Sequence, residues 1–228
     1  MPESEKPAIS GLKAAGIGCA VVVLVPVVFL LGLIITYSVQ RATPEDYPEV
    51  KPEAMGRRLG GYSQDAYAAL GIDRVLDPAG EGMREGDENH LSNDYCYPDG
   101  LESLADEPEE GAYQMGHSWA LQEVDKDQGL AALRRLHSHL GASAAWRVTQ
   151  SGYDDEYREW RVSAERDGGY QVSVAWSVRD QRLGGGVSAP CAYDPDWPEE
   201  GQLSDLPDTG TWPPPLTPRA MSRGRSTT

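Results

Sequence analysis

The sequence predicts an α+β protein: an N-terminal transmembrane helix, then a two-layer domain in which one main helix covers an antiparallel sheet. Three observations predict it. Residues 14–40 contain no charged side chain. Leucines between residues 130 and 140 recur at the spacing of one helix face. Apolar and polar residues alternate in several segments after residue 112, as in strands that are buried on one side. The expected order of elements in the domain is β-α-β-β-β.

The uncharged run from Ala14 to Gln40 is long enough to cross a bilayer. Its 27 residues would reach about 40 Å as an α-helix, against about 30 Å for the hydrocarbon core. A cleaved signal has a shorter apolar core, of about 7–15 residues, and a small residue where this chain has Gln40. Cys19 lies near the start of the run, whereas a lipid-modified cysteine follows its apolar segment, and Pro26 is tolerated in a membrane helix. We therefore expect a permanent single-pass anchor.

Two cysteines indicate which side of the membrane the domain occupies. Lys and Arg are evenly divided between the two ends of the apolar run, so their count sets no orientation. Cys96 and Cys191 bracket the expected domain, and disulfides persist outside the reducing cytosol. The alternative is a pair of unrelated buried thiols. A bond would close a loop of about 95 residues, which stabilises by about 4–5 kcal/mol in the chain-entropy model, and would place the domain outside the cytoplasm.

Acidic residues dominate the composition. The chain has 36 Asp and Glu against 20 Lys and Arg, a net charge of −16. This charge repels nucleic-acid phosphates and anionic lipid headgroups, so we expect no nucleic-acid partner. The expected partners are the lipid bilayer, through the apolar run, and an envelope protein or a wall component, through the domain. No cofactor is expected.

Proline-rich segments flank the expected domain. Three prolines and many charges without apolar periodicity predict a stalk before it, and a polar, proline-rich stretch predicts a disordered tail after it. This layout resembles that of small single-pass membrane proteins of actinobacteria, a resemblance of architecture alone. The predicted parts are a short cytoplasmic tail (1–13), a transmembrane helix (14–40), a stalk (41–60), an extracytoplasmic α+β domain (61–196) and a disordered Pro-rich tail (197–228).

The sequence of the first part of the domain predicts a short helix, a loop and a strand. Residues 63–70 are good helix formers, and Gly71 can end the helix. The stretch 77–94 has neither periodicity nor apolar density, which predicts a loop. Apolar residues at alternate positions of 113–124 predict a half-buried strand, with His117 on its apolar side as a hydrogen-bonded imidazole.

The sequence of the second part of the domain predicts the main helix and three strands. Asp125 or Asp127 can cap the helix, and Gly141 can close it. The sequence Asp-Gly-Gly at 167–169 separates two alternating runs and predicts a hairpin, because glycine tolerates the positive φ of such turns. The expected strands begin at Trp146, at Arg158 and at Tyr170, and Gly184, Gly185 and Gly186 are expected to bend the chain toward Cys191.

Three patterns resemble metal or catalytic sites, and each has a simpler interpretation. The stretch 125–129 begins like a calcium loop but lacks the later ligands of an EF-hand, so we expect a helix cap. The acidic residues at 85–94 could hold a weak calcium ion, but such loops are usually only solvated. His137 and His139 are two residues apart on a helix and so face different directions, unlike a zinc-binding pair. No metal ligands are predicted.

We also predict no catalytic residues. Ser118 lacks the Gly-x-Ser-x-Gly elbow of a hydrolase nucleophile. Carboxylates at 154–156 fit a solvated turn between two strands. The sequence therefore favours a membrane-anchored, extracytoplasmic binding or structural module of the cell envelope that is not an enzyme. Two alternatives stay open: a membrane-tethered hydrolase, and an acidic inhibitor or immunity-type protein that masks a basic partner.

Overall fold

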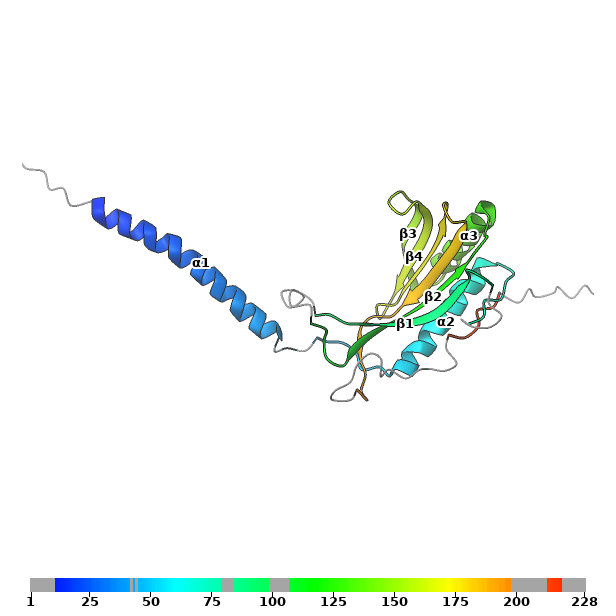
Figure 1. The fold of residues 1–228 in the computed structure, drawn as a ribbon, viewed down its shortest axis with the longest axis horizontal. Helices are drawn as coiled ribbons and strands as arrows, with labels where there is room; N and C mark the ends of the chain where they lie inside the picture. Colours follow the sequence, from blue (N-terminus) through cyan, green and yellow to red (C-terminus); the bar gives the residue numbers. More distant parts are fainter. Residues whose placement is uncertain are drawn as a thin grey trace, which may run out of the picture. The chain divides into compact units, whose positions relative to one another are not determined.

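A computed structural model of the chain shows an α+β fold with an antiparallel sheet and a few helices (Figure 1). It describes residues 11–41, 43, 45–78, 84–98, 107–197 and 213–218. The chain forms two compact units. The first contains residues 1–46 and 97–109, and the second contains residues 47–96 and 110–228.

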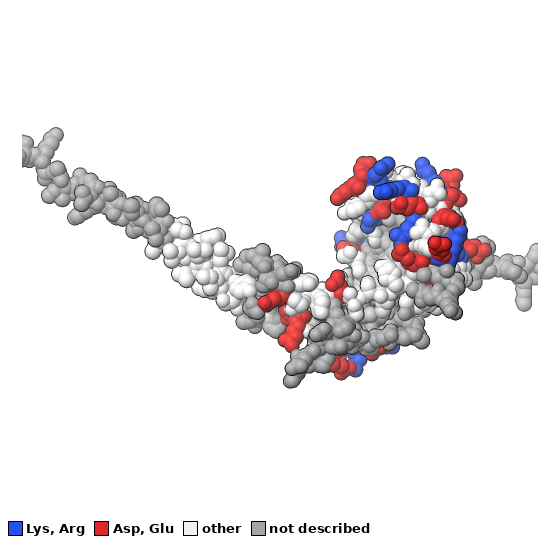
Figure 2. Space-filling view, in the orientation of Figure 1, with Lys and Arg blue, Asp and Glu red and all other residues white. Residues whose placement is uncertain are grey.

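The first unit contains one long helix, α1, from Gly11 to Arg41. The helix continues through Pro26. Its side chains are described between residues 24 and 39, and in Figure 2 these residues are drawn white because none is charged. Most of the large apolar side chains among them are exposed, such as Phe29 at 65%. Among the described residues, no helix combines the length and the apolar character needed to cross a membrane.

The second unit is built on a curved antiparallel sheet, which Figure 1 shows with its helices. Its strands lie in the order β1-β2-β6-β5-β4-β3, and β7 pairs with the start of β2. The chain thus passes from β2 to the far edge at β3 and returns strand by strand to pair with β2 again. The strands are β1 (Glu88–Tyr95), β2 (Ala112–Leu121), β3 (Trp146–Asp154), β4 (Glu159–Arg166), β5 (Gln171–Ser177), β6 (Arg182–Ser188) and β7 (Ala192–Tyr193).

Two helices cover one face of this sheet. α2 (Pro52–Leu70) packs mainly on β2 and β6, and α3 (Lys126–Ala142) packs on β3, β4 and β5. α3 begins as predicted, since the Asp125 carboxylate accepts a hydrogen bond from the Gln128 N–H at 2.8 Å. α2 ends at Gly71, whose φ of 62° is the left-handed conformation predicted for a glycine stop. The apolar side chains of both helices meet those of the strands in one core.

Glycines let two tryptophans enter this core. A Cβ atom on Gly129 of α3 would lie 2.4 Å from Cδ1 of Trp176, and one on Gly185 of β6 would lie 2.6 Å from Cζ2 of Trp119. Both rings are buried, and Trp119 also packs edge-on against Tyr67 of α2, with 5.2 Å between ring centroids. The two glycines therefore fix how closely helix and sheet approach.

The predicted disulfide is confirmed. Cys96 and Cys191 are bonded, with their Cα atoms 5.9 Å apart and a separation of 95 in the sequence. Cys96 follows β1 directly and Cys191 directly precedes β7, so the bond joins the two segments that flank β2 at this end of the sheet. Asp167-Gly168-Gly169 also forms the expected turn, with φ of 84° and 78° at the two glycines.

The domain begins earlier than predicted, and two helices rather than one cover the sheet. Residues 52–60, expected in a stalk, form the first half of α2. Met55 and Leu59 are fully buried there, one helical turn apart. The predicted β-α-β-β-β order also omits β1, β6 and β7. β1 is polar in sequence and lies within the expected loop 77–94, and β6 contains the glycine triplet, which is a strand interior rather than a bend.

Part of the expected tail packs on the domain. Residues 213–218 lie within the stretch 197–228, for which the sequence predicts disorder, and Leu216 is fully buried among core residues. The N–H groups of Leu76 and Leu216 each donate to the other's carbonyl at 2.9 Å. Gln64 of α2 donates to the Thr217 carbonyl at 2.8 Å and accepts from the Thr217 N–H at 3.0 Å. We call residues 213–218 the C-terminal strap.

Candidate functional site: a groove on the open face of the sheet

The face of the sheet opposite the helices carries a polar groove. Along the central strands, apolar residues point toward the helices and the alternate residues point to the open face, as in the buried and half-exposed alternation of Val172, Ser173, Val174 and Ala175 on β5. The open-face residues of the central strands are mostly Ser, Gly or Ala, and they leave a hollow of about 480 Å³. This size is within the range of small-molecule binding sites.

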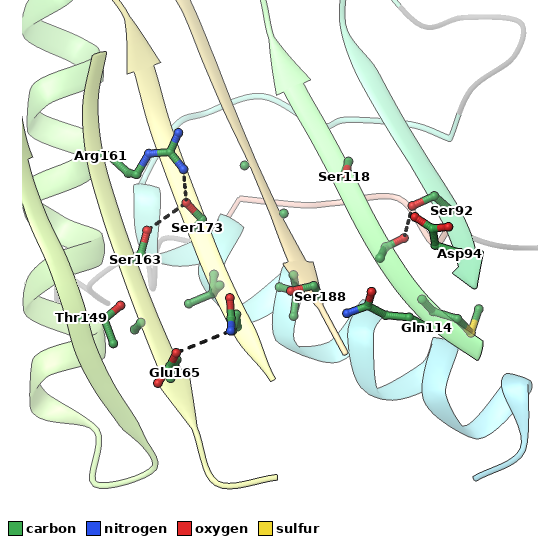
Figure 3. Close-up of a pocket in the computed structure, with 18 of the residues that line it drawn as sticks. Ser92, Asp94, Gln114, Ser118, Thr149, Arg161, Ser163, Glu165, Ser173 and Ser188 are labelled. Atoms are coloured by element: carbon green, nitrogen blue, oxygen red, sulfur yellow. Dashed lines mark hydrogen bonds between the residues drawn. The ribbon is translucent and has the colours of Figure 1, made fainter. Parts of the chain in front are cut away.

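Each of the six long strands contributes one hydroxyl side chain to the lining of this groove (Figure 3). We call these six residues the hydroxyl line. No sequence motif connects them, because they come from six different strands. From one edge of the sheet to the other they are Ser92 (β1), Ser118 (β2), Ser188 (β6), Ser173 (β5), Ser163 (β4) and Thr149 (β3).

Strand register places three of these hydroxyls in one row, which passes through Gly186 on β6. Gly186 of β6 lies between Ser118 of β2 and Ser173 of β5. Ser163 of β4 lies on the other side of Ser173. The hydroxyls of Ser163 and Ser173 are 3.0 Å apart and hydrogen-bonded (Figure 3). Thr149 is the extra residue of a β-bulge between Val148 and Gln150, and a bulge of this kind redirects a side chain. The bulge thus brings a hydroxyl of the edge strand into the groove.

The charged side chains in and beside the groove have partners. Arg161 of β4 forms an ion pair with Glu159 and donates to the Ser173 hydroxyl at 3.2 Å. Arg147 of β3 binds the Glu165 carboxylate at 2.7 Å. The carboxylate of Asp94 accepts a hydrogen bond from the N–H of the next residue at 2.8 Å. On the described part of the face that Figure 2 shows, acidic and basic side chains are intermixed.

Glycines form part of the groove floor. A Cβ atom on Gly186 would lie 2.7 Å from the carbonyl oxygen of His117, in the backbone of the neighbouring strand β2. One on Gly116 would lie 3.2 Å from the Ser92 hydroxyl, which donates to the Gly116 carbonyl at 3.3 Å. Larger residues at these positions would fill the floor or push strands apart, so the glycines keep the groove open.

The acidic stretch 85–94 does not form a cluster of ligands. The buried carboxylate of Asp87 accepts the Gln122 N–H at 2.8 Å and lies 3.5 Å from Nη1 of Arg74. Glu88 lies on β1 and binds Arg182 of β6 at 2.5 Å. Within the described part of the chain, no three His, Cys, Asp or Glu side chains come together as a metal site would require.

Three of the four histidines lie away from the groove, and the fourth, His90 of β1, lies opposite Ser118 in the strand pairing. His117 points into the core, where its Nε2 is 2.7 Å from Oδ1 of Asn89. Burial, with a smaller contribution from nearby His90, lowers the pKa of His117 to about 4. His139 of α3 binds the Asp65 carboxylate of α2 at 2.8 Å and so joins the two helices. His137 lies beside a separate apolar hollow between α3 and the strands β3 and β4.

Comparison with known proteins yields no relative: no protein-family model, no curated protein and no solved structure matches the chain. The function must therefore be inferred from the site itself. Sequence reasoning missed the groove, although one signal was present. In the strands β2 and β5, many positions that alternate with the apolar residues are small, with Ser, Gly or Ala where exposed strand positions often carry Thr, Lys or Glu.

Proposed function

We propose that this chain is a membrane-anchored, extracytoplasmic binding module of the cell envelope, that it is not an enzyme, and that its ligand lies in the groove on the open sheet face. The hydroxyl line carries the proposal. Six strands bring six hydroxyl groups to one surface, and an ordinary solvated sheet face has no need of such an alignment. Hydroxyls both donate and accept hydrogen bonds, which suits them to hold a polar ligand.

The chemistry of the lining supports binding rather than catalysis. A serine nucleophile needs a base within hydrogen-bond distance, usually a histidine that is itself held by a third group. The serines described here contact different partners: Ser163 contacts Ser173, Ser173 contacts Arg161, and Ser92 contacts a backbone carbonyl. The described lining contains neither histidine nor cysteine. His90 lies opposite Ser118 in the strand pairing. The described contacts include no hydrogen bond between the two side chains, so they do not form the serine–histidine pair that a hydrolase needs.

Two features support the proposed location. The uncharged run 14–40 falls within the unbroken helix α1, although the side chains of its first ten residues are not among those described. The disulfide between Cys96 and Cys191 favours an oxidising compartment, because the cytosol keeps thiols reduced. Together they favour a single-pass anchor that holds the domain outside the cytoplasm, with the short N-terminal segment inside.

Photo-crosslinking tests the groove. A photoreactive amino acid is placed at Ser118, the member of the hydroxyl line on β2, in the full chain expressed in its own cells. The matched control carries it at Ser138, an exposed serine of α3. We expect crosslinked products from position 118 that position 138 does not give. Equal patterns from the two positions, or none from position 118, would rule out the groove as the binding site.

Thiol labelling tests the location. In a Cys19→Ser variant only Cys96 and Cys191 remain. Intact cells are treated with a membrane-impermeant maleimide, with and without prior reduction by an impermeant phosphine. We expect labelling only after reduction. Thiols that react without reduction, and only once the cells are permeabilised, would place the domain in the cytoplasm and overturn this part of the proposal.

The acidic inhibitor or immunity-type alternative has its own test. The net charge of −16 would favour capture of a basic protein. Such electrostatic capture weakens as salt rises, because the Debye length falls from about 10 Å at 0.1 M salt to about 3 Å at 1 M. A crosslinked protein that is lost from position 118 at high salt would therefore favour the inhibitor over the envelope module.

A further inference from the structure

The geometry of the groove points to the class of its ligand: we infer that it is a neutral, linear glycan that lies across the strands and is held by hydrogen bonds from the hydroxyl line. This inference rests on the proposed function, since it concerns the same groove. It is carried by three observations: the spacing of the hydroxyls, the pairing of the charges and the flatness of the floor.

The spacing of the hydroxyl line suits a polymer. Neighbouring strands lie roughly 4.8 Å apart, and the hydroxyls occupy two adjacent rows that cross them. Ser118, Ser173 and Ser163 share one row, and Ser92 and Ser188, both level with Gly116, share the next. Each of these groups can both donate and accept a hydrogen bond. Glycan hydroxyls have the same dual capacity and recur with every sugar unit. A glycan chain that crosses the strands can therefore meet a new partner at each strand, as the labelled side chains of Figure 3 indicate.

The charges of the groove select against an ionic ligand. Arg161 is the single cation of the described lining, and it is already paired with Glu159. The lining carboxylate of Glu165 is bound by Arg147. An anionic polymer would thus find no unpaired cation and would face Asp94. A neutral ligand leaves the existing pairs intact and needs only hydrogen bonds, which the hydroxyls and the amide of Gln114 can supply.

The floor of the groove suits a sugar chain better than a peptide. Peptides that bind to sheets usually add a strand at an edge and place alternate side chains in pockets. Here the path crosses the strands, and the four strands β2, β6, β5 and β4 are already paired on both sides. Gly116, Gly186 and the small side chains around them form a shallow floor rather than a row of pockets.

The expected affinity follows from the same lining. None of the described lining residues is aromatic, so ring stacking on sugar faces does not contribute. Hydrogen bonds to solvated groups give modest net free energies, which corresponds to a dissociation constant on the order of 0.1–1 mM for a short oligosaccharide. Tight binding would require a long chain that occupies several parts of the groove at once.

The inference is tested with the full chain in detergent micelles and four neutral tetrasaccharides: chitotetraose, cellotetraose, laminaritetraose and mannotetraose. Saturation-transfer NMR detects binding at this affinity. The test variants are Ser163→Ala with Ser173→Ala, and separately Thr149→Val, which removes a hydroxyl at an exposed position without loss of volume. The matched control is Ser138→Ala on α3. Circular dichroism verifies that each variant keeps its fold.

We expect at least one tetrasaccharide to bind, independently of salt. The double variant should weaken this binding about tenfold and Thr149→Val about threefold, with Ser138→Ala unchanged. If none of the four tetrasaccharides binds while crosslinking from Ser118 persists, the ligand is not a neutral glycan, but the groove is still the binding site. If crosslinking from Ser118 fails as well, both proposals are wrong. A decalysine peptide that binds in place of the sugars, and is released by salt, would identify a cationic peptide as the ligand and overturn the glycan.

Discussion

His117 and Asn89 form a buried pair that joins the sheet to the C-terminal strap. Nε2 of His117 lies 2.7 Å from Oδ1 of Asn89, and the amide of Asn89 donates to the carbonyls of Leu76 and Pro214. Because the Asn89 amide nitrogen faces two acceptors, its oxygen must face the imidazole. The His117 Nε2 therefore carries the proton, and Nδ1 is a buried acceptor without a partner among the described groups.

This pair predicts that the domain loses stability in mild acid. Burial lowers the pKa of His117 to about 4, against a usual value of 6.5, so the unfolded chain binds a proton more readily than the folded one between these values. The free energy of unfolding is therefore unaffected by the titration of His117 above pH 6.5, and it decreases as the pH falls from 6.5 toward 4. At about 1.4 kcal/mol per pKa unit, the loss reaches about 3 kcal/mol. Urea unfolding at several pH values measures it.

The control separates this titration from that of the carboxylates. In His117→Gln the side-chain amide can still donate to Asn89 but does not titrate, so the fall in stability between pH 6.5 and 4 should shrink by most of that amount. A control at a non-titrating surface position, Ser138→Gln on α3, should leave the pH profile unchanged. An unaltered profile in His117→Gln would show that His117 is not responsible.

Leu216 of the C-terminal strap should contribute strongly to the stability of the domain, although it lies beyond residue 196, where the sequence predicts that the domain ends. Leu216 is fully buried, and it pairs with Leu76 through two backbone hydrogen bonds. Leu216→Ala should lower the free energy of unfolding by about 2–5 kcal/mol, as for other buried leucines. Val75→Ala is the control, since Val75 adjoins the same bridge but is 52% exposed. Equal, small effects would show that the strap contributes little to stability.

The strap also shows why part of the fold could not be predicted. Its sequence is proline-rich with a single leucine, so neither periodicity nor composition marks it as ordered. What orders it is tertiary: backbone hydrogen bonds with Leu76 and an amide donor from Asn89, both distant in sequence. By contrast, the cap at Asp125, the stop at Gly71 and the hairpin at 167–169 depend on local geometry, and the sequence predicted all three.

Two strands were missed for related reasons. β1 contains one large aliphatic residue, Leu91, because the open side of an edge strand and a polar contact at Asn89 remove the usual alternation. β6 contains Gly185, whose space is filled by the ring of Trp119 from the neighbouring strand. In both, the apolar contact comes from another element, so a single-strand pattern does not reveal it. The hydroxyl line has the same origin, since it exists only once the strand order is known.

Removal of the disulfide should lower the stability of the domain. Reduction of the bond in the wild-type protein should have the same effect. Cys96→Ala with Cys191→Ala should lower the free energy of unfolding by about 2–5 kcal/mol. Alanine avoids the unpaired hydroxyl that serine would place at the buried Cys96 position. Wild-type protein measured with a reductant should resemble the double variant, while Cys19→Ser should behave as wild type. Reductant without effect on the wild type would show that the bond does not form in solution.

A matched pair of glycines on α3 tests the packing of helix on sheet. Glycine to alanine within a helix normally stabilises by about 1 kcal/mol. At Gly141 no atom lies within 4 Å of the added Cβ, so Gly141→Ala should show this gain. At Gly129 the added Cβ would lie 2.4 Å from the Trp176 ring, which is buried and donates from Nε1 to the Val124 carbonyl at 2.9 Å.

The ring of Trp176 cannot move away from Gly129 without breaking that hydrogen bond, so the helix must move instead. Gly129→Ala should therefore destabilise by about 1–3 kcal/mol, the usual cost of overpacking, in spite of its better helix propensity. Thermal unfolding of the two variants measures the difference. Opposite signs at the two positions would confirm that Gly129 sets the distance between α3 and β5. A gain at both would mean that the helix and the sheet are packed less closely than described.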